Sequence, residues 1–181
     1  MIHSYDTLPD KPHEECGVFG FYNNDDFDLA SLTRAALYGL QHRGQESVGM
    51  TIIKDGEPYT VKDLGIVSNV LTDKALSKLP EGGKISVGHV RYTTLDYLER
   101  AATQPLVMRY IEGSLALAHN GSITNFAELR TELERGGSIF QSNSHAEVIG
   151  YRIAVNRVGS ESSEPLIVPD IVFVSITKTP Y

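Results

Sequence analysis

The chain has 181 residues, which is enough for one domain with a hydrophobic core but short for two. Apolar residues make up 41% and charged residues 22%, as is ordinary for a folded globular protein. The formal net charge of −7 argues against nucleic acid as a partner, because such binding needs clustered Lys and Arg. No apolar run approaches the roughly 20 residues that span a bilayer, and the amino end lacks a hydrophobic signal core. We therefore expect a cytoplasmic domain that binds neither nucleic acid nor membrane.

The composition of the chain changes abruptly after a polar segment at its beginning. Residues 1–15 carry two prolines and two histidines without helical or strand periodicity, so we interpret them as a leader. Residues 16–22 form a short run typical of a strand, and residues 23–26 favour a turn. Leucines and alanines then recur at helical spacing over 29–40, which predicts a helix with one buried face.

The middle of the chain predicts a hairpin, a short helix and one more strand. Strands are expected at 50–53 and 59–62, joined by a turn that contains Asp-Gly. A helix is expected at 71–79, where the following proline ends it, and an alternating strand at 85–92.

The last part predicts strands at 114–119 and 169–177 and helices at 125–134 and 144–158. Strands in hairpins with few parallel crossovers indicate an α+β layered domain. The final strand follows a polar linker at 159–165, and the chain stops soon after it. Because a lone terminal strand needs a partner in the same sheet, we expect a truncation at the carboxyl end.

Cys16 is the single cysteine, which excludes an internal disulfide and any site with several thiolate ligands. One interpretation is a buried structural thiol, since free cysteine is among the most buried residue types. The other starts from its place where the leader meets a strand. A cysteine at an amino terminus can use its own α-amine, with an unperturbed pKa of roughly 7.7–8.0, as the general base. Removal of the leader would make Cys16 such a nucleophile.

Four blocks of sequence place further polar and glycine residues in a definite order. They are Glu14-Glu-Cys-Gly-Val-Phe-Gly20, Leu40-Gln-His-Arg-Gly-Gln-Glu-Ser-Val-Gly49, Gly88-His-Val-Arg-Tyr-Thr-Thr94 and Ala118-His-Asn-Gly-Ser-Ile-Thr-Asn125. In this order and at these intervals the blocks resemble the glutamine-hydrolysing domain of the amidophosphoribosyltransferase family. The second block favours this branch over the glucosamine-phosphate synthase and asparagine synthetase branches, which share the amino-terminal-cysteine fold.

The resemblance implies a propeptide at 1–15 and a class II glutamine amidotransferase domain at 16–181. Its fold would be a four-layer αββα sandwich of the N-terminal-nucleophile hydrolase type. It implies hydrolysis of glutamine to glutamate and ammonia, as the ammonia-supplying half of an enzyme of de novo purine biosynthesis. The phosphoribosyltransferase domain, which uses magnesium and in some members accompanies an iron–sulfur cluster, is absent from this sequence. We expect no cofactor in this domain, glutamine as its ligand, that second domain as partner in a full-length enzyme, and a homo-oligomer.

The resemblance also implies the catalytic residues. Cys16 attacks the side-chain carbonyl of glutamine, and the carboxamide of Asn120 and the backbone N–H of Gly121 stabilise the oxyanion. Without the resemblance, Asn120-Gly121 would read as a hairpin turn. Arg91 holds the α-carboxylate of glutamine in a bidentate pair, the alternative being an arginine at a strand edge.

Three more residues are expected around the same pocket. By resemblance, Thr94 adds a hydroxyl contact and Arg43 and Gly44 line the pocket, although Arg43 could instead pair only with Glu46. The histidines at 42, 89 and 119 are interpreted as structural, because carboxylates at ligand spacing do not accompany them and a metal site is therefore not indicated.

The sequence departs from the family pattern at two places. His145 stands where the family has an aspartate that grips the α-ammonium of glutamine. A neutral His145 could accept one hydrogen bond from the ammonium and a protonated one would repel it, so we expect weaker glutamine binding and a pH dependence. Glu147 is not expected to reach the ligand. Leu95-Asp96 replaces a turn of small residues before the pair Gln104-Pro105, in a loop that shapes the pocket.

Two alternatives stay open at this stage. A diverged or truncated copy could keep the fold, leave Cys16 inside an uncut chain, and bind a partner or a glutamine-like ligand. An enzyme of the same class could instead hydrolyse another amide, such as a γ-glutamyl compound without a free α-amine. His145 is compatible with both.

Overall fold

The structure, a computed structural model, describes residues 16–92, 100–111, 113–157 and 171–177. The predicted leader at 1–15 and linker at 159–165 lie outside these described residues.

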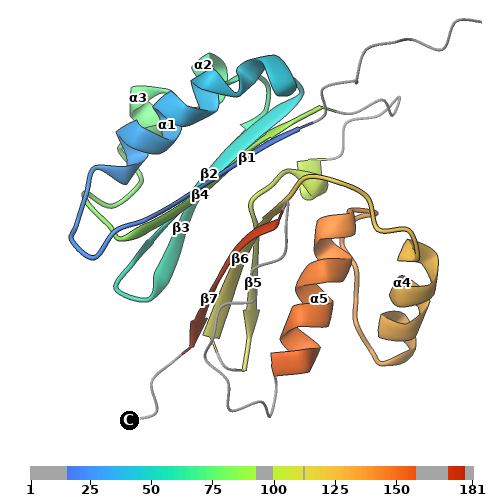
Figure 1. Cartoon of the computed structure of the whole chain (residues 1–181). Helices are drawn as coiled ribbons and strands as arrows, with labels where there is room; N and C mark the ends of the chain where they lie inside the picture. The colour runs from blue at the N-terminus through green and yellow to red at the C-terminus, as the bar shows by residue number, and fades with distance from the viewer. Residues whose placement is uncertain (1–15, 93–99, 112, 158–170, 178–181) are drawn as a thin grey trace, which may run out of the picture.

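The described residues contain seven strands in two antiparallel sheets (Figure 1). The four-stranded sheet has the order β1-β4-β2-β3 and consists of β1 (Gly17–Tyr22), β4 (Ile85–Arg91), β2 (Ser47–Lys54) and β3 (Glu57–Leu64). The three-stranded sheet has the order β5-β6-β7 and consists of β5 (Leu106–Tyr110), β6 (Gly113–His119) and β7 (Ile171–Thr177).

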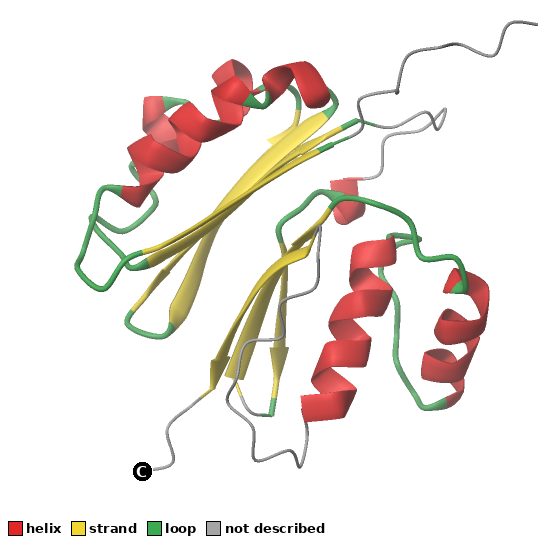
Figure 2. Ribbon diagram, viewed as in Figure 1, coloured by secondary structure: helices red, strands yellow, loops and turns green. Residues whose placement is uncertain are grey.

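Helices cover the outer faces of both sheets, and the inner faces of the sheets contact each other (Figure 2). On the four-stranded sheet lie α1 (Leu29–Gly39) and the single-turn helices α2 (Val67–Val70) and α3 (Asp73–Leu76). On the three-stranded sheet lies α5 (His145–Arg157), with α4 (Phe126–Arg135) packed against it. Two short 3₁₀ turns complete the described elements, η1 (Gln41–Arg43) and η2 (Arg100–Ala102).

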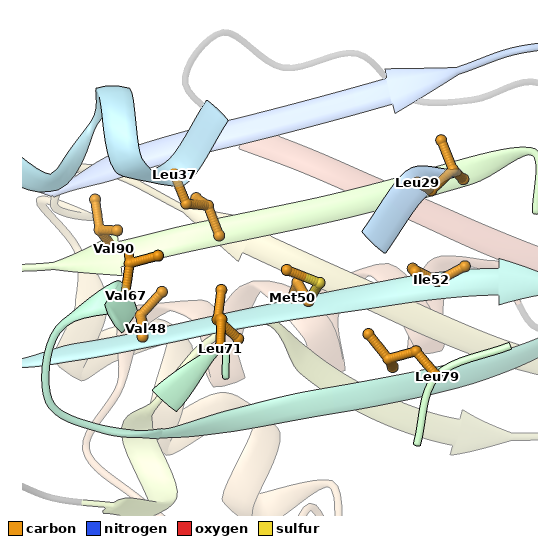
Figure 3. Packing of buried hydrophobic residues seen from close by; sticks show 9 residues of the cluster. All are labelled: Leu29, Leu37, Val48, Met50, Ile52, Val67, Leu71, Leu79 and Val90. Carbon is orange, nitrogen blue, oxygen red and sulfur yellow. The ribbon is translucent and has the colours of Figure 1, made fainter. Parts of the chain in front are cut away.

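The larger hydrophobic core lies between α1 and the four-stranded sheet (Figure 3). Its nine buried side chains are Leu29, Leu37, Val48, Met50, Ile52, Val67, Leu71, Leu79 and Val90. A smaller core joins β6 to α5 through Leu115, Leu117, Ala146 and Ile153. Because β2 has one face toward α1 and the other toward the second sheet, its residues from Ser47 to Ile53 are buried on both faces.

The alternation along β4 decides what this strand presents to each neighbour. Ser86 faces α1, where Thr33 donates to its hydroxyl at 2.8 Å. Gly88 lies on the same face, and a Cβ there would come within 3.0 Å of Thr33 and Leu37. His89, the residue after Gly88, therefore faces the three-stranded sheet, as does Arg91 two residues further on.

The α+β class predicted from the sequence is confirmed, as is the hairpin around Asp55 and Gly56, both of which have positive φ. The helix predicted at 71–79 is shorter in the structure, where α3 covers only Asp73–Leu76 and begins after Thr72, whose hydroxyl accepts a hydrogen bond from the Ala75 backbone. The single turn α2, which precedes this span, was not predicted. β5 was not predicted, since five residues with a central Met and Arg give little alternation. Within the described part of the chain, no helix is long and apolar enough to cross a membrane.

Candidate active site

Cys16 lies immediately before β1, at the end of the four-stranded sheet where β1 begins and β4 ends. Gly17 pairs with Val90, so continuing the register places Cys16 opposite Arg91. The thiol of the half-buried Cys16 donates to the carbonyl of Tyr92, with a sulfur–oxygen distance of 3.4 Å. Its backbone carbonyl accepts a hydrogen bond of 2.7 Å from Nε of Arg43. The φ of Cys16 is +48°, in the left-handed region that a residue with a side chain seldom adopts.

Arg43 and Gly44 bring the turn η1 against this edge of the sheet. A Cβ at Gly44 would lie 2.5 to 2.8 Å from the backbone C, O and N of Arg91, so only glycine fits here without a shift. The chain after Gly44 stays close to the end of β4, because Glu46 N donates to the carbonyl of Arg91 at 3.1 Å. The structure thus gathers Cys16, Arg43, Gly44 and Arg91 from three places in the sequence.

Arg91 carries a buried donor that its neighbours do not satisfy. Its Nη1 is shielded from solvent and has no hydrogen-bond partner among the described residues, and the same is true of the hydroxyl of Ser47, its partner in the β2–β4 register. A buried charged donor without a partner costs free energy. The side chain is therefore suited to an anionic ligand that arrives with its own acceptors.

His89 links this edge to the second sheet. The side chain is fully buried, and burial lowers the pKa of its imidazole to about 3. The backbone of His119 acts in the opposite direction and raises this pKa, although no hydrogen bond of ordinary geometry forms, while the charges of Arg91 and His119 lower it further. The end of β6, where His119 stands, consequently lies close to the inner face of β4.

Asn120 and Gly121 follow directly from that end of β6. Gly121 has a φ of +137°, and a Cβ there would lie 3.4 Å from the His119 ring. The alternative of a hairpin turn at Asn120-Gly121 is wrong, because the next element is α4 and not a strand. Gln104 fixes the preceding residue, since its Oε1 accepts from His119 N at 2.6 Å and its Nε2 donates to His119 O at 3.2 Å.

His145 is committed to a hydrogen bond that the sequence did not reveal. Its Nδ1 accepts from the backbone N–H of Ile123 at 2.8 Å, and its ring stacks on Phe126 with centroids 4.4 Å apart. Burial lowers the pKa of this ring, which favours the neutral form. With Nδ1 accepting, the neutral ring carries its proton on Nε2 and has no acceptor left. The expectation that neutral His145 accepts a hydrogen bond from an ammonium is corrected on this ground.

Glu147 serves the structure of the preceding loop. Its buried carboxylate accepts from Gln141 N at 2.7 Å, from Ser142 N at 2.9 Å and from the Ser142 hydroxyl at 2.7 Å. These bonds tie the loop to the first turn of α5.

Two predicted features of the site cannot be placed. Thr94 and the Leu95-Asp96 pair lie outside the described residues. In the residues that the structure does describe, no group of three or more His, Cys, Asp or Glu side chains is arranged to hold a metal ion.

Comparison with known proteins places this geometry in a family. The sequence profile described as "Glutamine amidotransferase domain" matches residues 75–166, about half of the chain. The chain therefore belongs to the glutamine amidotransferase domain family.

Individual relatives narrow the family further and confirm the resemblance to amidophosphoribosyltransferases. Amidophosphoribosyltransferase 2, chloroplastic, of Arabidopsis thaliana is 42% identical over 153 residues, which are 84% of this chain and 27% of the relative. The amidophosphoribosyltransferase of Bacillus subtilis is 43% identical over 143 residues, 78% of this chain and 29% of the relative. A solved structure of glutamine phosphoribosylpyrophosphate amidotransferase from B. subtilis, complexed with ADP and GMP, matches 80% of this chain and 30% of its own, with a TM-score of 0.69 and 38% identity. The chain spans less than a third of the length of these relatives.

Sequence reasoning missed two residues that shape the site. Gln104 was noted as part of a Gln-Pro pair, but nothing in the sequence connects it with His119. Lys62 gave no signal at all, although its Nζ donates to the carbonyls of Thr103 at 2.6 Å and Pro105 at 3.0 Å.

Proposed function

We propose that this chain hydrolyses glutamine to glutamate and ammonia, with Cys16 as the nucleophile once residues 1–15 have been removed. In a full-length amidophosphoribosyltransferase the ammonia would serve a phosphoribosyltransferase domain in de novo purine biosynthesis. Membership of the glutamine amidotransferase domain family and the names of the relatives support this assignment. A homo-oligomer is still expected. So is the cytoplasm, although the names of the plant relatives place those proteins in chloroplasts.

We further propose that residues 16–181 form an αββα sandwich of the N-terminal-nucleophile hydrolase type. The order of helix, sheet, sheet and helix supports it (Figure 2). The likeness to solved amidotransferases, with TM-scores of 0.69 and 0.71, supports it as well.

The observation that carries the functional proposal is the buried Nη1 of Arg91, which lacks a partner among the described residues. The continued β1–β4 register places Arg91 opposite Cys16. A glutamine α-carboxylate would satisfy it with charge-assisted hydrogen bonds. Arg43 would hold the carbonyl of Cys16, and Gly44 would let η1 approach closely enough to do so. Thr94 remains a proposed hydroxyl ligand.

The chemistry requires a base, an oxyanion site and a water molecule. The α-amine of the matured Cys16 removes the thiol proton, and the thiolate forms a bond to the side-chain carbonyl carbon of glutamine. The Asn120 carboxamide and the Gly121 N–H stabilise the oxyanion. When the carbon–nitrogen bond breaks, the ammonium proton passes to the leaving nitrogen and ammonia departs. Water then attacks the thioester, its proton returns to the amine, and glutamate and the free thiol are released.

The backbone at Cys16 supports removal of the residues before it. A φ of +48° costs a residue with a side chain about 1–2 kcal/mol. Once the preceding peptide bond is cut, the preceding carbonyl is gone and its part of the steric conflict is removed. Maturation would therefore relieve strain at the residue that needs a free amine.

One observation bears on the substrate. Because Nδ1 of His145 already accepts from Ile123, the ring offers an N–H donor where the family has an aspartate. A donor does not bind an ammonium, so we propose a raised KM for glutamine. The same geometry favours, as a second candidate substrate, an amide whose α-position carries an acceptor in place of the ammonium.

The test starts with the intact mass and the amino-terminal sequence of the protein purified from its host. A chain that begins at Cys16 and releases glutamate from glutamine supports the proposal, with Cys16→Ser as the inactive control. A thiol-directed glutamine analogue should label the wild type and spare Arg91→Ala. A processed chain that neither hydrolyses glutamine nor is labelled would refute the proposal and favour a binding module.

A further inference from the structure

Gln104 stands where the β5–β6 ladder would have continued. Leu106 pairs with Leu117, so two steps back along the same register put Gln104 opposite His119. In an antiparallel ladder, every second facing pair exchanges two backbone hydrogen bonds. Here the side-chain carboxamide of Gln104 makes both bonds to the backbone of His119, accepting one and donating the other. The carboxamide thus makes the two hydrogen bonds that the backbone N–H and C=O of a paired residue would make in the ladder.

The backbone of the same segment is held by the other sheet. Lys62 in β3 donates to the carbonyls of Thr103 and Pro105, on both sides of Gln104. The carbonyl of Gln104 itself lies over Gly49 in β2, where there is no room for a Cβ. Lys62 is half-buried, and burial lowers the pKa of its ammonium group, so its two hydrogen bonds to carbonyls hold the segment in a partly desolvated place.

These contacts make the segment at 103–105 a bridge between the two sheets. Its backbone is attached to the sheet that ends beside Cys16, and its side chain is attached to the strand that leads into Asn120 and Gly121. The Gln104 side chain is almost fully buried, so water does not compete for either bond. The Gln104 carboxamide therefore helps to fix the position of the proposed oxyanion donors, Asn120 and Gly121, relative to the Cys16 thiol.

We propose that Gln104 is a positioning residue for the oxyanion site, acting through both backbone groups of His119. This inference rests on the proposed glutamine hydrolysis for its effect on catalysis, whereas its effect on the placement of residues 120 and 121 does not depend on that activity. Gln104 does not touch the substrate. Its loss should lower kcat rather than raise KM, because oxyanion donors act on charge that develops in the transition state.

The chemistry of the two hydrogen bonds supplies a specific test. In Gln104→Glu the ionised carboxylate still accepts from His119 N–H but opposes His119 C=O with a second acceptor. A protonated carboxyl group restores one acceptor and one donor in nearly the same shape as the carboxamide. Burial and the facing carbonyl both raise the pKa of this new carboxyl group above its ordinary value near 4.3. The defect of this variant should accordingly be repaired as the pH falls.

The experiment compares the wild type, Gln104→Glu and Gln104→Met, each purified as the matured chain and checked by circular dichroism for folding. We expect Gln104→Met to lose about 10²-fold in kcat at every pH, with little change in KM. The kcat of Gln104→Glu, taken as a ratio to the wild type at each pH, should rise by up to about tenfold per unit as the pH falls toward the carboxyl pKa. Taking the ratio removes the titration of the Cys16 amine. A constant ratio would overturn the proposal.

A second measurement separates this inference from the proposed function. The backbone amide signals of Asn120 and Gly121 are followed by nuclear magnetic resonance over the same pH range. In Gln104→Glu they should shift with the titration of the new carboxyl group, whether or not the wild type hydrolyses glutamine. If the wild type is inactive but these signals titrate, the proposed function fails and the positioning role stands. Signals that match the wild type at all pH values would overturn the positioning role.

Discussion

Acid should destabilise this protein through His89, which lies buried between the two sheets. The pKa of its imidazole is about 3 in the folded chain, compared with the ordinary value of about 6.5 expected after unfolding. The folded state thus holds the neutral ring and the unfolded state binds the proton. The stability contributed by the neutral ring is complete above pH 6.5 and is lost as the pH falls toward 3.

The size of the effect follows from these two pKa values. Each pH unit between them costs about 1.4 kcal/mol, so the free energy of unfolding should fall by about 3 kcal/mol between pH 7 and pH 4 from this group alone. For a domain with a total stability of about 5–15 kcal/mol this is a large fraction. Burial of His145 lowers the pKa of that ring as well, so it acts in the same direction.

Urea unfolding at several pH values between 7 and 4, followed by far-ultraviolet circular dichroism, measures this dependence. The matched control is His89→Leu, which keeps a side chain of similar volume but cannot be protonated. We expect the variant to lose the part of the pH dependence assigned to His89. At pH 7 it should be at least as stable as the wild type, because leucine removes two buried nitrogens that lack a hydrogen bond of ordinary geometry. Equal pH dependence in both proteins would refute the reasoning.

Three further substitutions test the site and its support. Arg91→Lys keeps the charge but loses the planar fork, so KM for glutamine should rise about tenfold with little change in kcat, and an unchanged KM would contradict the proposed carboxylate contact. Gly44→Ala forces a Cβ within 2.5 to 2.8 Å of the Arg91 backbone and should lower both kcat/KM and, by about 1–3 kcal/mol in urea unfolding, the stability. Gly39→Ala is the matched control, because a Cβ added there would meet no atom within 4 Å outside its own helix, and it should lower neither kcat/KM nor the stability. Glu147→Gln replaces one of the two acceptor oxygens by an NH2 group, which then faces either the Gln141 N–H or the two Ser142 donors, and it should cost about 1–3 kcal/mol; an unchanged melting temperature would contradict this.

Much of the fold followed from local pattern. The strand at 85–92 was predictable because its side chains alternate in character along the chain. The helix at 29–40 was predictable because apolar residues recur at helical spacing along it. The bounds of the helix predicted at 71–79 were too wide, because the Thr72 hydroxyl caps a helix that begins at Asp73 and ends at Leu76.

The sequence alone supplied the candidate residues of the proposed site. Cys16 and Arg91 could be named from motif and chemistry, because the side chains that break or hold bonds must be of a few types. Tertiary structure decided how they are held. The Gln104–His119 pair spans 15 residues and His145–Ile123 spans 22, and in each case the partner is a backbone group. Every residue except proline carries such an N–H group and every residue such a carbonyl, so sequence cannot say which one a side chain will meet. Only the packing of the two sheets and α5 makes that choice.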